Sequence, residues 1–126
     1  LSLKHDAGHD SAGELRSNRE PVTDLTTSPG AVHPVVRTHP ETGRKALFLG
    51  RRLNGYFPGM ALAESEALLN TLWAHATQEK LTWHQEWRRG DMIIWDNRCA
   101  MHRRDSFDPA SRRIMHRTQV SGSAPY

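Results

Sequence analysis

A short apolar run at residues 92–95, Met-Ile-Ile-Trp, constrains the fold more than any other feature of this chain. The run follows a Gly-Asp turn signal and is too brief for a helix, so it predicts a buried strand. The residues after it are mostly polar and lead to His102. The strand is therefore predicted to end among polar side chains and to deliver an imidazole just beyond its last residue.

A second strand is predicted at residues 112–120, after a loop at residues 105–111 that contains Asp-Pro and two serines. Side chains alternate between the two faces of a strand, so Arg113 and Arg117 share one face, with Cα atoms about 13 Å apart at a rise of ~3.3 Å per residue. Both guanidinium groups then lean into one cavity. Together with His102 they suggest a site for a metal ion and a small carboxylate.

The preceding part of the chain predicts a hairpin, one helix and a further short strand. Residues 32–39 and 45–49 form the hairpin, because a Pro-Glu-Thr-Gly-Arg turn separates them. Residues 81–88 predict the further strand, because Trp83 and Trp87 are an even number of positions apart and would lie on the same face of it. Residues 61–78 predict the helix, because apolar side chains recur there at helical spacing. Those side chains are Leu68, Leu69, Leu72, Trp73 and Ala76.

Length and composition place limits on the class of protein. A chain of 126 residues suffices for one domain, and the order of elements predicts a mostly β domain with one covering helix, of the α+β class. No apolar run approaches membrane-spanning length, and the single Cys99 excludes an internal disulfide, which suits a cytoplasmic protein. A net charge of +3 without a run of basic residues does not favour nucleic acid. We expect neither a nucleic-acid nor a membrane partner, and we expect a homo-oligomer.

Histidines followed two residues later by an acid are candidates for iron ligands, because two such side chains project from one face of a strand. The sequence has two of these pairs, His39 with Glu41 and His84 with Glu86. Glu41 lies in a predicted turn behind a proline, and the tryptophans beside His84 favour an ordinary amphipathic strand. Neither pair is predicted to bind a metal.

Several stretches together resemble the TauD/TfdA family of Fe(II)- and 2-oxoglutarate-dependent dioxygenases. Trp-Asp-Asn-Arg at residues 95–98, followed by His102, Arg113 and Arg117, resembles the C-terminal signature of that family. Residues 33–44 are similar to a second family stretch, and the Gly-Asp pair before the apolar run is similar to a third.

The resemblance covers most of residues 32–120 and implies a domain organisation. The polar and poorly periodic composition of residues 1–31 separately predicts an irregular segment without a leading element that has a core face. Residues 32–126 are expected to be the C-terminal part of a double-stranded β-helix, or jelly roll. The His-x-Asp pair of the family belongs to a part of the fold that precedes residue 1. The chain is therefore expected to be a fragment that is inactive alone.

The resemblance also implies roles for four residues. His102 would be the distal iron-binding histidine, and Trp95 would wall the iron pocket. Arg113 would pair with the far carboxylate of 2-oxoglutarate, and Arg117 would lie near the acidic group of the substrate or the near end of the co-substrate. The complete enzyme would use Fe(II), 2-oxoglutarate and O₂ to hydroxylate a small acidic substrate, similar to an aryloxyalkanoate or a sulfonate, with succinate and CO₂ as the other products.

Two further hypotheses stay open. The chain could be a small basic module without catalysis that binds an anion or a nucleic acid. Its contacts would come from Arg98, Arg103, Arg104, Arg112, Arg113 and Arg117. It could also be a metallohydrolase that binds zinc through His5, His9 and either His39 or His84.

Overall fold

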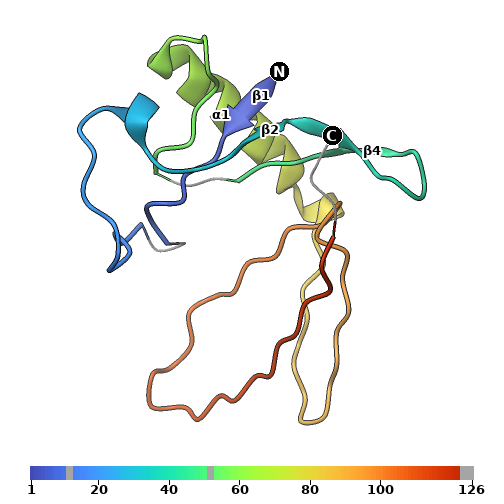
Figure 1. The fold of residues 1–126 in the computed structure, drawn as a ribbon. Coiled ribbons are helices and arrows are strands. Elements are labelled where there is room, and N and C mark those ends of the chain that lie inside the picture. Colours follow the sequence, from blue (N-terminus) through green and yellow to red (C-terminus); the bar gives the residue numbers. More distant parts are fainter. Residues whose placement is uncertain (11–12, 51–52, 123–126) are drawn as a thin grey trace.

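The computed structural model describes residues 1–10, 13–50 and 53–122 (Figure 1). It contains four short strands and one α-helix, so the coarse class predicted from the sequence is confirmed. The strands are β1 (Ser2–Lys4), β2 (Val32–Pro34), β3 (Val36–Thr38) and β4 (Lys45–Leu47), and the helix is α1 (Leu62–Ala76). Two short 3₁₀ turns, η1 (Leu25–Thr27) and η2 (Glu79–Leu81), complete the order of elements.

The first sheet pairs β1 with β2 in antiparallel fashion, with Leu3 opposite His33. Leu3 is fully buried and belongs to a core cluster with Phe57 and Leu69. The expectation that the chain begins without an element that has a core face is therefore wrong. Three residues carry too little pattern to predict a strand, and β1 is defined by its pairing with a partner far along the chain. The predicted domain division at residue 32 stays a prediction.

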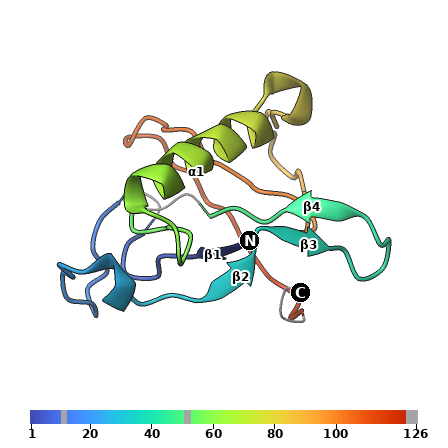
Figure 2. The same cartoon turned by 90° about the horizontal axis from the view of Figure 1, so that it is seen from above.

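The predicted strand at residues 32–39 is divided at Val35. Val35 is buried, its N–H donates to the carbonyl of Leu1 at 3.1 Å, and its carbonyl accepts from the N–H of Phe48 at 2.6 Å. The chain passes there from the first sheet into a second, in which β3 and β4 pair antiparallel with Arg37 opposite Ala46. The predicted hairpin is thus confirmed for β3 and β4, and Figure 2 shows the loop that joins them.

The helix α1 lies within the range predicted from its apolar spacing and runs across the strands in Figure 2. Leu69 is buried in the core, and the other members of the predicted stripe pack against it partly buried, so the predicted face is confirmed. Ser65 fixes the start of the helix, because its buried hydroxyl accepts the N–H of Phe57 at 2.9 Å. Neither α1 nor another helix in the described ranges has the length and apolarity needed to cross a membrane.

Residues 82–122 extend away from the packed part as two long loops, yellow to red in Figure 1. The strands predicted at residues 81–88, 92–95 and 112–120 are not formed, so these three predictions are wrong. Met92 is 81% and Ile94 is 86% exposed where burial was predicted. A strand requires a neighbour to satisfy its backbone groups, and none of the described residues pairs with these segments.

Candidate functional site

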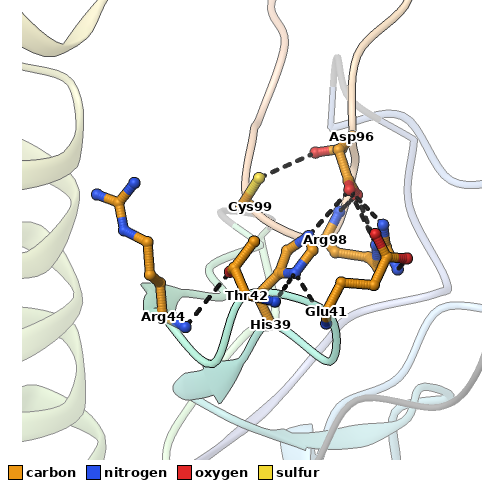
Figure 3. Close-up of polar contacts among 7 residues, drawn as sticks. All are labelled: His39, Glu41, Thr42, Arg44, Asp96, Arg98 and Cys99. Atoms are coloured by element: carbon orange, nitrogen blue, oxygen red, sulfur yellow. Dashed lines mark hydrogen bonds and ion pairs between the residues drawn. The ribbon is translucent and has the colours of Figure 1, made fainter.

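An ionic network joins the β3–β4 loop to the segment that leads to His102 (Figure 3). The His39 Nε2 atom lies 3.0 Å from Oδ2 of Asp96. The Arg98 guanidinium binds the same carboxylate, with Nε 2.9 Å from both oxygens and Nη2 2.6 Å from Oδ2. Its Nη1 donates to Oε1 of Glu41 at 2.8 Å. Two segments separated by 57 residues are thereby held together.

The orientation of His39 follows from its other contacts. Its Nδ1 accepts the backbone N–H groups of Glu41 and Thr42, each at 3.3 Å, so the ring hydrogen lies on Nε2 and is donated to Asp96. The backbone N–H of His39 donates to Arg44 and its carbonyl accepts from Gly43. The ring is buried, and it is therefore fixed at both nitrogens and at the backbone.

Asp96 also organises the turn in which it lies. Its Oδ1 accepts the N–H of Arg98 at 2.8 Å, and its carbonyl accepts the N–H groups of Cys99 at 3.2 Å and Ala100 at 3.0 Å. The hydrogen bonds from the Arg98 side chain, followed by that from His39, hold the pKa of Asp96 well below its usual range. Arg98 likewise lowers the pKa of Glu41, and the Asp96 carboxylate raises the pKa of Arg98.

Trp95 and His102 lie side by side at the two ends of this turn. Their ring centroids are 5.1 Å apart with the planes inclined by 54°. The indole N–H of Trp95 donates to Oδ1 of Asn97 at 2.8 Å, so the indole is held from within the turn. His102 is exposed. The structure therefore brings together two of the four predicted site residues, and their roles stay predictions.

The two predicted arginines lie elsewhere on the loops. The Arg113 guanidinium carbon lies 5.4 Å from the ring centroid of Phe107, and Arg104 approaches the same ring at 5.1 Å. Arg113 also lines a hollow with Trp87 and Met115, and Arg117 is exposed. Their predicted position on one strand face is wrong, because residues 112–120 form no strand. Across the described residues, neither arginine makes a hydrogen bond or a ring contact with His102.

The described residues offer a single group of three potential metal ligands, and His102 is not in it. The group comprises His39, Asp96 and Cys99, whose ligand atoms lie within 4.8 Å of one another. A cation there would meet the guanidinium of Arg98, which already binds both Asp96 oxygens, so the donor set does not suit a metal. A catalytic iron takes three protein ligands, and the described residues form no group of three that includes His102.

Comparison with known proteins identifies the family. The family model described as taurine catabolism dioxygenase TauD, TfdA family, matches residues 1–119. This chain belongs to the TauD/TfdA family.

Three relatives illustrate the similarity to other TauD/TfdA proteins. The chain is 41% identical to the (S)-phenoxypropionate/alpha-ketoglutarate-dioxygenase of Sphingobium herbicidovorans, over 78% of this chain and 34% of the relative. It is 40% identical to the alpha-ketoglutarate-dependent 2,4-dichlorophenoxyacetate dioxygenase of a Burkholderia species, over 71% and 30%. It is 32% identical to a putative alpha-ketoglutarate-dependent sulfonate dioxygenase of Schizosaccharomyces pombe, over 100% and 32%. The chain spans about a third of the length of these relatives. No solved structure matches it.

Sequence reasoning missed the ionic network of this TauD/TfdA chain. It treated His39 and Glu41 only as a disfavoured metal pair, whereas the structure directs both toward the segment after residue 95. A signal was present in the Asp-x-Arg spacing of Asp96 and Arg98, which lets a guanidinium fold back on a nearby carboxylate.

Proposed function

We propose that this chain supplies the C-terminal part of an Fe(II)- and 2-oxoglutarate-dependent dioxygenase with a jelly-roll core. The observation that carries the proposal is the family match over residues 1–119. The relatives' names refer to alpha-ketoglutarate-dependent oxygenation, and the chain covers about a third of their length, which supports a part rather than a whole enzyme. The family match gives no support to a basic binding module or a His-rich metallohydrolase.

In this proposal His102 contributes one iron ligand, and the remaining ligands come from outside the chain. Bound iron, together with 2-oxoglutarate and O₂, supplies the oxidising chemistry. Trp95 lies against His102 and limits the approach of water from that side. The exposure of His102 is consistent with a ligand that awaits further partners.

Arg113 and Arg117 are proposed to bind the carboxylates of the co-substrate and the substrate. A guanidinium offers a planar fork that matches a carboxylate, and such charge-assisted hydrogen bonds are stronger than neutral ones. The Arg113 guanidinium packs against the Phe107 ring, which leaves its N–H groups available to an anion.

The exposed apolar side chains of the two long loops support the same proposal. Five of them stand more than half exposed, namely Trp83, Met92, Ile94, Ile114 and Val120. Large apolar side chains along extended backbone are typical of strands that lack a covering layer. In a complete jelly roll, neighbouring strands would complete the backbone hydrogen bonds of the segments predicted at 92–95 and 112–120, and a facing sheet would bury these side chains.

The substrate is proposed to be a small acid of the aryloxyalkanoate or sulfonate type. The relatives carry the names of phenoxypropionate, 2,4-dichlorophenoxyacetate and sulfonate, all of them anions at neutral pH. We propose a cytoplasmic homo-oligomer without nucleic-acid or membrane partners.

The test is complementation of this chain with the N-terminal two-thirds of the Sphingobium relative. With Fe(II), 2-oxoglutarate and phenoxypropionate, the mixture is expected to form succinate, and neither part alone is expected to do so. Arg113→Ala should raise the 2-oxoglutarate requirement about tenfold or more, because a charged hydrogen-bond partner is lost. Arg19→Ala is the matched control and should leave that requirement unchanged, because Arg19 is exposed and lies outside the hollow that Arg113 lines. An unaltered requirement in Arg113→Ala would contradict the assignment.

A further inference from the structure

We propose that His39, Asp96, Arg98 and Glu41 are positioning residues that hold the turn at residues 96–100 and thereby keep Trp95 and His102 side by side. The assignment of His102 as an iron ligand rests on the proposed function. The placement of the two rings does not depend on that assignment.

The network is the polar connection between the loops and the packed part of the molecule. Among the described residues, the hydrogen bonds and ion pairs that join residues 83–122 to residues 1–78 are two, His39 to Asp96 and Glu41 to Arg98. The remaining polar contacts of residues 83–122 are internal to that segment, as between Gln85 and Asp91. These four side chains therefore supply the described polar contacts that place the segment relative to the core, beside its covalent connection through η2.

The fixed side of this connection is the β3–β4 hairpin. His39 directly follows β3, its ring is buried, and both of its ring nitrogens are used. The backbone of His39 closes the hairpin loop through Arg44 and Gly43. A ring held in this way presents its Nε2–H in one direction only, so it specifies where the carboxylate of Asp96 must lie.

The turn at residues 96–100 depends on this connection, because other oxygen atoms of Asp96 accept the hydrogen bonds that hold the turn. The carboxylate accepts the N–H of Arg98, and the Asp96 carbonyl accepts from Cys99 and Ala100. Trp95 directly precedes this turn and His102 follows it by two residues. A change at Asp96 therefore changes the angle between the two arms that carry the indole and the imidazole.

Arg98 and Glu41 form the second contact between the turn at residues 96–100 and the β3–β4 hairpin. The guanidinium uses Nε and Nη2 for Asp96 and Nη1 for Glu41, so the planar group spans the gap between turn and hairpin (Figure 3). Glu41 is largely exposed, and its contact is the weaker part because solvent screens it. We therefore rank Asp96 and His39 above Glu41 in the expected size of effect.

The test is NMR spectroscopy of the isotope-labelled chain without metal. In the wild type the His102 ring protons should be displaced by the ring current of Trp95. Asp96→Ala and His39→Ala should abolish that displacement and accelerate amide exchange at Cys99 and Ala100 by about three- to tenfold. Asp96→Asn keeps a side-chain oxygen and should show an intermediate effect.

Matched controls separate positioning from general damage. Asp105→Asn alters an exposed pair with Arg103, and His84→Ala alters an exposed histidine, so both should leave the His102 signals unchanged. Amide protection of Leu69 in α1 reports on the core and should persist in each variant. If Asp96→Ala loses the amide protection of Leu69, Asp96→Asn takes its place as the variant compared with the wild type.

Unchanged His102 shifts and unchanged exchange at Cys99 and Ala100 in Asp96→Asn and His39→Ala would overturn the proposal. So would equal changes in Asp105→Asn. The proposed function is judged separately, by iron binding of the complemented enzyme with and without His102→Ala. If His102→Ala binds iron as the wild type does, the iron assignment fails while the NMR result still decides the positioning role.

Discussion

The imidazole of His39 donates a hydrogen bond to the carboxylate of Asp96 over 3.0 Å, and 57 residues of sequence separate the two. His39 closes the β3–β4 hairpin, and Asp96 begins a turn in a segment without strand pairing. This bond gives the loop that carries His102 a defined place beside a folded sheet.

The stability of the chain should fall in acid partly through Asp96. Arg98 and His39 lower its pKa in the folded state below the unfolded value of about 4. Its contribution is therefore present above about pH 4 and is lost as the pH falls further toward the folded pKa. Urea unfolding at pH 7 and pH 3 should show a smaller loss for Asp96→Asn than for the wild type. Asp105→Asn, at an exposed pair, should lose as much as the wild type; an equal loss in all three proteins would contradict the assignment.

Ser65→Ala should destabilise the chain by about 1–3 kcal/mol, because it leaves the buried N–H of Phe57 without its acceptor. The measurement is the free energy of unfolding in urea. Thr71→Ala is the matched control, since the exposed Thr71 hydroxyl donates to a helix carbonyl that is already in the helical ladder. It should change stability by less than about 0.5 kcal/mol. Equal effects of the two substitutions would refute the role of Ser65.

Gly30→Ala should be among the most damaging substitutions on the N-terminal side. Gly30 has a φ of 154°, and a Cβ there would lie 1.6 Å from the backbone oxygen of His5. The backbone between β1 and β2 would have to move, at a cost of about 2 kcal/mol or more in unfolding free energy. Gly122→Ala meets open space and should unfold as the wild type does. Thermal unfolding of both variants checks this, and a wild-type midpoint for Gly30→Ala would refute the clash.

The local elements were predictable and the pairings were not. Helix α1 was predictable from apolar side chains three and four residues apart, because the whole of its apolar face lies within 15 consecutive residues. The β3–β4 hairpin followed from its turn chemistry, which is also local. Strand β1 was missed because Ser2–Lys4 becomes a strand only by pairing with β2. The strands predicted after residue 81 have suitable side chains, yet none of the described residues supplies their hydrogen-bonding neighbours.

In the candidate site, too, the local features were predictable from the sequence and the long-range contacts were not. The proximity of Trp95 and His102 arises within one turn, so a short sequence motif sufficed to select both residues. The contact of His39 with Asp96 needs the hairpin and the turn to meet in space, which no periodicity encodes. The arginines were selected by resemblance and by an expected strand, and without that strand their geometry differs from the expected one.

Val35 joins two sheets through its own two backbone groups, because its N–H donates to Leu1 and its carbonyl accepts from Phe48. Loss of the bond to the Leu1 carbonyl would release the Val35 amide, which directly precedes β3. One continuous path of backbone and hydrogen bonds thus runs from Leu1 through β3 and His39 to Asp96, in the turn that precedes His102.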